Sequence, residues 1–309
     1  MLPQLSASQA AAAPCESVAD WWPRHRAIAA GNADPIHQAV IGGFVADRAG
    51  WAFASGYQAA LRALFPDAPA DRICALCVTE ADGNAPKAIK SSLKKAGGGW
   101  LLNGSKRWTT LGPDGALFFV AARDEAASAQ RPAIRIVRVS SGAPGLKIQV
   151  MPQTNFVPEV PHAQLEFKNL GIEETEILPG DGYDQYVKPF RTVEDIHVQA
   201  ALLSYLMREG QRLSWPQGWL ERLSALLAAM GKLADMPPAH AETHIALAGA
   251  LAISGGLIAE TEPFWEAAAG DPAAARWKRD RELLKVAGSA REQRTRRAWE
   301  NLRRPAPAG

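Results

Sequence analysis

The first part of the chain, about residues 15–72, has a helical pattern of hydrophobic positions. Between Val18 and Leu64, apolar residues recur near the period of an amphipathic helix: Ile36, Val40, Phe44, Trp51, Phe53, Tyr57, Leu61 and Leu64. Pro66 and Pro69 follow, and proline cannot continue a helix. The pattern predicts a short helical N-terminal domain, preceded at residues 1–14 by a disordered tail.

Between about residues 73 and 180 the pattern changes to short β-prone runs separated by Gly, Pro, Asn and Asp. The candidate strands are Cys74–Thr79, Ala88–Lys95, Trp100–Trp108, Leu117–Ala122, Ile134–Val139, Leu146–Met151 and Ala163–Leu170. Gly97-Gly98-Gly99 supplies the positive φ angles of a hairpin turn. So many short strands are typical of an antiparallel sandwich or barrel, and we expect a β middle domain here.

The last segment, residues 181–309, returns to helical periodicity. One apolar stripe contains Val193, Ile196, Ala200, Leu203 and Met207, and a second contains Leu220, Leu223, Leu227, Met230 and Leu233. The long apolar stretch Ile245–Ile258 is too short to span a bilayer and is interpreted as a buried helix. Helices, then strands, then helices predict an α+β multidomain fold that ends in a helical bundle.

Composition excludes several classes of function. The net charge of +2 gives no electrostatic basis for binding nucleic acid or an anionic membrane. The six histidines show no metal-ligand spacing, so no metal site is expected. Three cysteines are too few for a disulfide framework and favour the cytoplasm. Cys74 and Cys77 have the spacing of a redox pair, but their apolar run favours two buried residues of a strand.

Four motifs in the β segment keep a common order and spacing. They are Cys77–Gly83, the hairpin Gly99–Gly112, Pro144–Lys147 and Pro161–Leu170, followed by Gly182-Tyr183 at the start of a long helix. The hairpin reads Gly-Trp-Leu-Leu-Asn-Gly-Ser-Lys-Arg-Trp-Thr-Thr-Leu-Gly. Together these motifs resemble the middle domain of the acyl-CoA dehydrogenase family, and the chain is similar to a divergent, shortened member.

The resemblance implies FAD as cofactor and an acyl-CoA thioester as substrate. By similarity, Val78 and Thr79 would meet the pyrimidine edge of the flavin, Thr110 would approach its N5, and Trp108 would pack beside the ring. The flavin would carry the redox chemistry while the protein orients it. The same residues also suit a simpler role, since Trp108 could be core and both threonines could be strand packing residues.

Two departures from the family pattern concern chemistry. Asn84-Ala85-Pro86 replaces the family's Gly-Ser-Asp, which removes a hydroxyl near the cofactor phosphates and, at Pro86, a backbone donor. Aligning Gly288 and Gln293-Arg294 with the family's C-terminal motif puts Ala287 where the catalytic glutamate belongs. A minority of the family places the base near the start of the first C-terminal helix, and there Glu194 is the candidate, with His197 one turn on. Glu194 also suits a solvated helix N-terminus.

Two functions therefore stay open. One is an FAD-dependent oxidoreductase that acts on the CH–CH group of an acyl-CoA and passes electrons to a flavoprotein acceptor. The other is a flavin- or acyl-CoA-binding scaffold that has lost the base. Leu213–Trp219 does not match the family motif that contacts a neighbouring subunit, so a family-like tetramer with shared cofactor sites is not assumed, and a homodimer is the assembly considered.

Overall fold

The computed structural model describes residues 13–65, 67–127 and 133–303, so most of the tail expected at residues 1–14 lies outside the described residues. The chain forms two compact units. One contains Met1–Ala63, Asn155–Val157 and Thr192–Gly309, and the other contains Leu64–Thr154 and Pro158–Arg191. The first is helical and the second is built around a sheet, which confirms the predicted α+β class.

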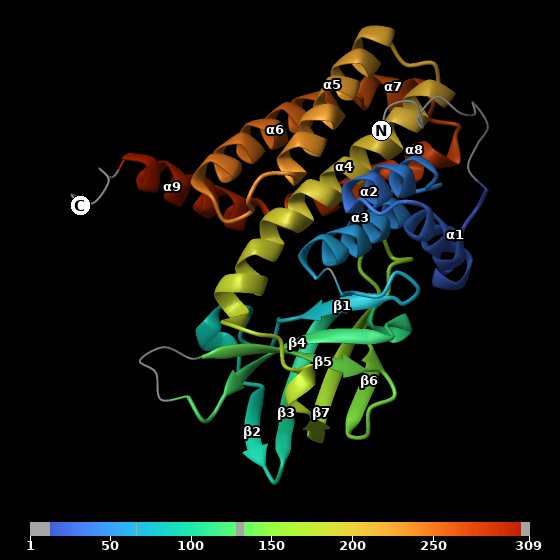
Figure 1. Ribbon diagram of the computed structural model, residues 1–309. Helices are drawn as coiled ribbons and strands as arrows, with labels where there is room; N and C mark the ends of the chain where they lie inside the picture. Colours follow the sequence, from blue (N-terminus) through green and yellow to red (C-terminus); the bar gives the residue numbers. More distant parts are fainter. Residues whose placement is uncertain (1–12, 66, 128–132, 304–309) are drawn as a thin grey trace. The chain divides into compact units, whose positions relative to one another are not determined.

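Helices from both ends of the chain belong to the helical unit. They are α1 (Val18–Gly31), α2 (Pro35–Phe44), α3 (Ala49–Leu64), α4 (Lys188–Arg212), α5 (Gln217–Ala234), α6 (Ala241–Ala259), α7 (Glu262–Ala267), α8 (Pro272–Asp280) and α9 (Gly288–Arg303) (Figure 1). The Ser17 side chain accepts a hydrogen bond from Asp20 N to cap α1, and Asp34 and Asp271 cap α2 and α8 ahead of a proline. These local signals explain where the three helices begin.

Small residues let α2 and α3 approach α4 closely. A Cβ added at Gly43 would lie 2.0 Å from the carbonyl oxygen of Ala201, and one at Gly56 would lie 2.6 Å from Cα of Val198. Ala39, Ala59 and Ala201 pack together at the same contact. Residues distant in the sequence thus form one core, because side chains larger than a methyl group are absent where the backbones meet.

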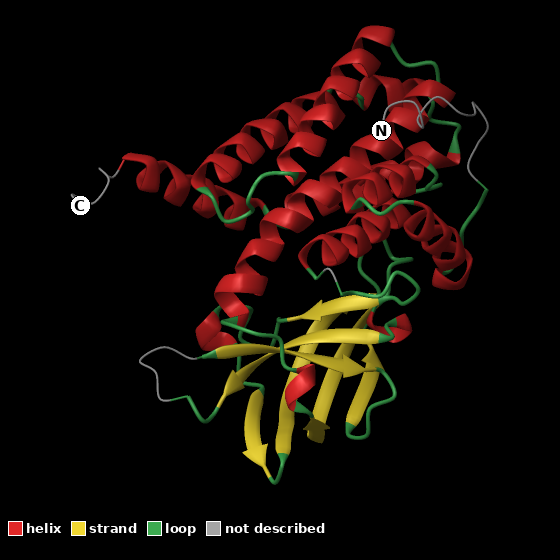
Figure 2. Cartoon of the chain, in the orientation of Figure 1, coloured by secondary structure: helices red, strands yellow, loops and turns green. Residues whose placement is uncertain are grey.

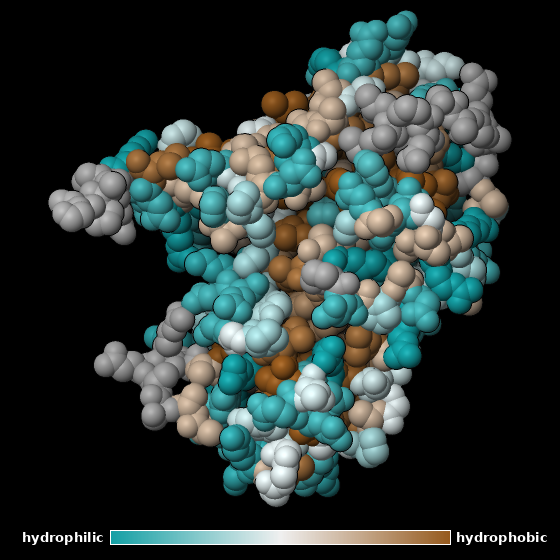
Figure 3. Space-filling view, in the orientation of Figure 1, coloured by the Kyte–Doolittle hydropathy of each residue, from teal (hydrophilic) through white to brown (hydrophobic). Residues whose placement is uncertain are grey.

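Helix α6 departs from the expectation of a buried helix. Leu247, Ala250 and Leu257 are buried. However, only 28% of the most apolar stretch of this helix is buried, and Ile253 is 61% exposed. Brown and tan residues lie among hydrophilic ones over α6 (Figure 3). Length and composition alone would let the helical stretch Ala241–Ala267 cross a membrane, which for a single helix is weak evidence.

A single curled sheet forms the β unit (Figure 2). Its strands are β1 (Cys74–Cys77), β2 (Ser92–Ala96), β3 (Gly99–Thr110), β4 (Leu117–Asp124), β5 (Ile134–Ser140), β6 (Leu146–Val150) and β7 (His162–Ile172). They run in the order β1-β4-β2-β3-β7-β6, with β5 paired to β4. Strand β4 pairs in parallel with β1 and β2, and the other neighbours are antiparallel. Gly97, with φ of 61°, makes the predicted hairpin turn between β2 and β3.

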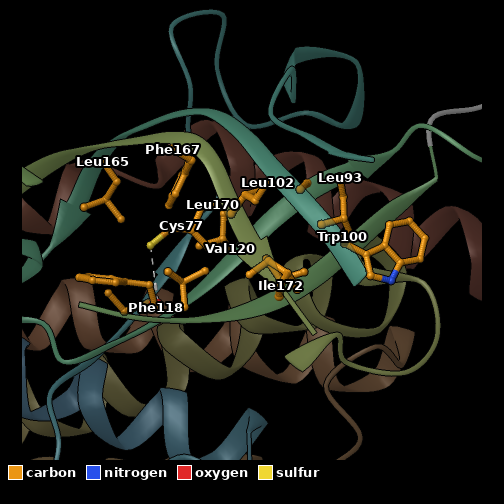
Figure 4. Close-up of a cluster of buried hydrophobic side chains, with 14 of the residues drawn as sticks. Cys77, Leu93, Trp100, Leu102, Phe118, Val120, Leu165, Phe167, Leu170 and Ile172 are labelled. Carbon is orange, nitrogen blue, oxygen red and sulfur yellow. Dashed lines mark hydrogen bonds between the residues drawn. The ribbon is translucent and has the colours of Figure 1, made fainter. Parts of the chain in front are cut away.

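Side chains from most of these strands form one apolar core, which includes Leu93, Phe118 and Leu165 (Figure 4). Cys77 belongs to this core, and burial raises the pKa of its thiol to about 12. Cys74 is buried as well, and all three cysteines are free thiols. The pair with redox spacing is therefore a structural part of β1, as its apolar run indicates.

Truncation of Ile136, a fully buried residue of β5 outside this cluster, tests how closely the β unit is packed. We expect Ile136→Ala to lower the free energy of unfolding by about 2–5 kcal/mol, because the substitution leaves a cavity in a closely packed interior. Urea unfolding monitored by circular dichroism gives the value. A loss below about 1 kcal/mol would show that the site collapses or is already loosely packed.

Candidate flavin-facing site

A β-bulge near the end of β3 shapes the surface that carries the sequence-predicted residues. Lys106 pairs with Leu165 and Thr109 pairs with Ala163, so β3 has one residue more than β7 between these pairs. Trp108 lies in the bulge with φ of 57°, which is unusual for a residue other than glycine. The bulge turns Lys106 inward, where it is fully buried, and leaves Trp108 46% exposed.

The two residues that follow Trp108 continue this alternation. Thr109 is buried, and its hydroxyl lies 3.8 Å from Cys77 Sγ, whereas Thr110 is partly exposed. The backbone N–H of Trp108 donates to Met151 Sδ at 3.2 Å. The indole ring meets the His162 ring edge-on, with centroids 5.9 Å apart. Contacts on its flank thus hold an exposed aromatic ring in place.

His162 is a neighbour that was not among the sequence-predicted cofactor residues. It pairs with Thr110 across the sheet. Burial lowers its pKa, against a hydrogen bond with the Val160 backbone that raises it. The imidazole is therefore neutral at pH 7 and supports the Trp108 ring as an uncharged aromatic group.

The chain segment that follows β1 lies beside the bulge. Thr79 accepts a hydrogen bond from the backbone N–H of Arg107 at 2.8 Å, which brings Val78 and Thr79 next to Trp108. All four sequence-predicted cofactor residues, Val78, Thr79, Trp108 and Thr110, thus lie at one end of the β unit and are at least partly exposed. We call these four residues the wall.

The chemistry of the wall fits a flavin ring. An isoalloxazine needs a flat apolar surface and hydrogen-bonding groups along its edge. Within the described part of the chain, the hydroxyls of Thr79 and Thr110 and the indole N–H of Trp108 have no hydrogen bond to protein, so they remain available to a ligand. Asn84, at the departure from the family pattern, already accepts a hydrogen bond from Arg191 at 3.0 Å.

Beneath the wall is a buried ion pair. Lys106 Nζ lies 2.5 Å from Glu80 Oε1, and the exposed fractions of the two side chains are 0% and 7%. Burial opposes the charge of Glu80, but Lys106 and two backbone N–H groups outweigh it and hold the pKa of Glu80 below its ordinary value. Burial likewise lowers the pKa of Lys106, against the attraction of Glu80. Both residues belong to the sequence motifs, but their pattern does not reveal that they are buried together.

Comparison with known proteins relates the β unit to one protein family. Residues 75–170 match the family profile described as acyl-CoA dehydrogenase, middle domain. The β unit is therefore similar to the middle domain of the acyl-CoA dehydrogenase family. Benzylmalonyl-CoA dehydrogenase of Aromatoleum aromaticum is 26% identical over 177 residues, 54% of this chain and 45% of that relative. The matched stretch thus spans less than half of that relative's length.

Solved structures extend the likeness in fold to most of the chain. Butyryl-CoA dehydrogenase from Megasphaera elsdenii has a TM-score of 0.65 at 14% identity, covering 85% of this chain and 81% of its own. PigA in complex with FAD has a TM-score of 0.68 at 14% identity, covering 92% and 90%. The two units together therefore have the acyl-CoA dehydrogenase fold.

The helical unit carries the two positions considered for a catalytic base. Ala287 directly precedes α9 and offers only a methyl group. Glu194 lies near the start of α4 and is partly exposed. His197 is buried with Nδ1 2.8 Å from the Val193 carbonyl oxygen, and burial lowers its pKa to about 4. A neutral, backbone-bonded His197 is a structural residue and does not support Glu194 electrostatically.

The negative charge of Asp195, the carboxylate next to Glu194, is balanced by two arginines of α9. Its Oδ1 accepts bonds from Arg291 Nε at 2.9 Å and Nη2 at 2.7 Å, and its Oδ2 accepts one from Arg294 Nη2 at 2.7 Å. These contacts commit the carboxylate to a structural link. Arg291 follows Ala287 by one helical turn, so the same link brings the Ala287 position to the part of α4 that carries Glu194.

No described group of three or more His, Cys, Asp or Glu side chains could hold a metal ion.

Removal of the Glu80 charge gives a pH-dependent test of the ion pair. Because its pKa is lower in the folded protein, Glu80 contributes stability above about pH 4.3, and this contribution is lost as the pH falls through the folded pKa. The difference in unfolding free energy between the wild type and Glu80→Gln should be largest at neutral pH and shrink in acid. Urea unfolding at a series of pH values measures it, and a difference independent of pH would refute the ionic role.

Proposed function

We propose that the chain is an FAD-binding oxidoreductase of the acyl-CoA dehydrogenase type, acting on the CH–CH group of an acyl-CoA thioester. The observation that carries the proposal is the bulge of β3, which holds Trp108 outward with φ of 57° beside Thr79 and Thr110. A tryptophan in a strained backbone conformation is retained at a cost, and such strain is common at binding sites.

Each wall residue has a distinct task in this proposal. Trp108 provides the flat apolar surface against the ring, and the hydroxyls of Thr79 and Thr110 bond to its polar atoms. The backbone at Val78 contributes to the same edge. The bound flavin supplies an acceptor for the hydride that leaves the β-carbon of the thioester.

Glu194 is the proposed proton acceptor for the α-carbon. Ala287 cannot accept a proton, and Asp195 is held by Arg291 and Arg294. Glu194 is next to Asp195, a residue of α4 that bonds to α9. The carboxylate of Glu194 could therefore replace a carboxylate at position 287. Electrons would then pass to a separate flavoprotein acceptor.

A second function is favoured by two specific residues, Ala287 and Pro86. Such a protein would lack a base and would have fewer donors for the cofactor phosphates. It would then bind a flavin or an acyl-CoA as a scaffold and would not oxidise the acyl-CoA. Reduction of the bound flavin by a substrate separates these two functions.

The wall is tested by the affinity for FAD. We expect Trp108→Ala to weaken binding about tenfold or more, because loss of a stacking surface costs about 1.4 kcal/mol or more. Quenching of flavin fluorescence during titration of the apoprotein measures this. Trp299→Ala is the matched control, since Trp299 is also 46% exposed but lies on α9. Equal affinities of the two variants would remove Trp108 from the site, and no FAD binding by the wild type would remove the flavin.

The base is tested by mixing FAD-loaded protein anaerobically with saturated acyl-CoA thioesters of increasing chain length. We expect bleaching of the flavin absorption by at least one thioester, and Glu194→Gln should slow it by about 10²–10⁴-fold, as removal of a general base does. Glu292→Gln, an exposed carboxylate of α9, is the control and should bleach at the wild-type rate. Unchanged bleaching of Glu194→Gln would exclude Glu194, and a wild type that is never bleached would favour the scaffold.

A further inference from the structure

The Glu80–Lys106 pair connects more of the β unit than an isolated ion pair does. Glu80 Oε2 accepts from the backbone N–H of Lys90 at 2.7 Å, and Oε1 accepts from that of Ser91 at 3.0 Å as well as from Lys106 Nζ. Lys106 Nζ also lies 3.4 Å from the carbonyl oxygen of Val78. One carboxylate and one ammonium group therefore join the segment after β1, the segment before β2, and β3.

The polar contacts around this pair leave little freedom to the segments it joins. The Ser91 hydroxyl donates to the Ser105 carbonyl oxygen at 3.3 Å. Gly104 has φ of 130°, and a Cβ there would lie 2.5 Å from Ser91 Oγ. Glu80 and Gly83 exchange two backbone hydrogen bonds that close the turn after Glu80. Both charges are thus fixed by directional bonds, in a place where an apolar pair would fill space without fixing an orientation.

The ion pair borders the wall on both sides. Glu80 directly follows Thr79, and Lys106 is two residues before Trp108. The bond from Arg107 N to Thr79 O lies between them and is the direct contact of the two segments. Any movement of Lys106 away from Glu80 would therefore alter the spacing between Thr79 and Trp108.

We propose that Glu80 and Lys106 are positioning residues, whose ion pair sets the spacing between the Thr79 and Trp108 sides of the wall. This inference rests on the proposed function for its consequence, which is the affinity for FAD. The spacing itself is a property of the apoprotein. It can therefore be tested without any cofactor.

The first measurement is hydrogen exchange of the apoprotein, followed by mass spectrometry of peptides. Lys106→Met keeps the length of the side chain and removes its charge, and Glu80 keeps two N–H donors. We expect amides in residues 78–91 and 105–111 to exchange about tenfold faster in Lys106→Met, with β5 unchanged, because the opening is local. Ile136→Ala, which weakens the packing of the same unit at a buried position of β5, is the control and should not accelerate these segments selectively.

The second measurement is FAD titration of the same proteins. We expect Lys106→Met to bind FAD at least about tenfold more weakly than the wild type, Lys106→Arg to recover part of the affinity by retaining the charge, and Ile136→Ala to bind as the wild type does. If Lys106→Met does not fold, Glu80→Gln takes its place, since the amide still accepts one of the backbone bonds.

The outcomes separate the inference from the function on which it rests. A folded Lys106→Met with wild-type exchange at residues 78–91 and 105–111, or with wild-type FAD affinity, overturns the positioning role and leaves the flavin site intact. Local acceleration of exchange in a protein whose wild type binds no FAD supports the pair as the spacer of these segments and overturns the proposed function.

Discussion

The β-bulge between Lys106 and Thr109 is the constraint on which the account of this protein depends. In a regular strand, Lys106, Trp108 and Thr110 would share one face. The extra residue reverses the alternation, so that Lys106 is buried against Glu80 while Trp108 and Thr110 remain accessible. One local irregularity therefore produces both the buried charge pair and the exposed aromatic surface.

Each of the two units contains a buried carboxylate whose negative charge is balanced by neighbouring basic groups. Glu80 is held by Lys106 and two backbone N–H groups, and Asp195 is held by Arg291 and Arg294. Because each is compensated, neither is suited to accept a proton from a substrate. In the proposed function, Glu194 on α4 takes the role of a carboxylate at position 287.

The sequence predicted the seven strands and the helical segments, because these follow from periodicity and turn residues. It left open whether Trp108 and Thr110 face a ligand or pack within the sheet. It could not predict the bulge, since alternation in β3 assigns Lys106 and Trp108 to one face. The support of Trp108 by Met151 and His162 joins residues from separate strands and leaves no local pattern. Ile245–Ile258 was wrongly expected to be buried, because apolar composition does not distinguish a buried helix from one with an uncovered side.

The most direct test of the flavin-facing wall is a footprint of FAD on the wild-type apoprotein by hydrogen exchange. The account predicts that saturating FAD slows exchange in residues 78–80 and 106–111, where Thr79 and Trp108 lie, and that the effect is weaker in β5. Binding of FAD with no protection in these two segments would contradict the account, because the flavin would then occupy another part of the molecule.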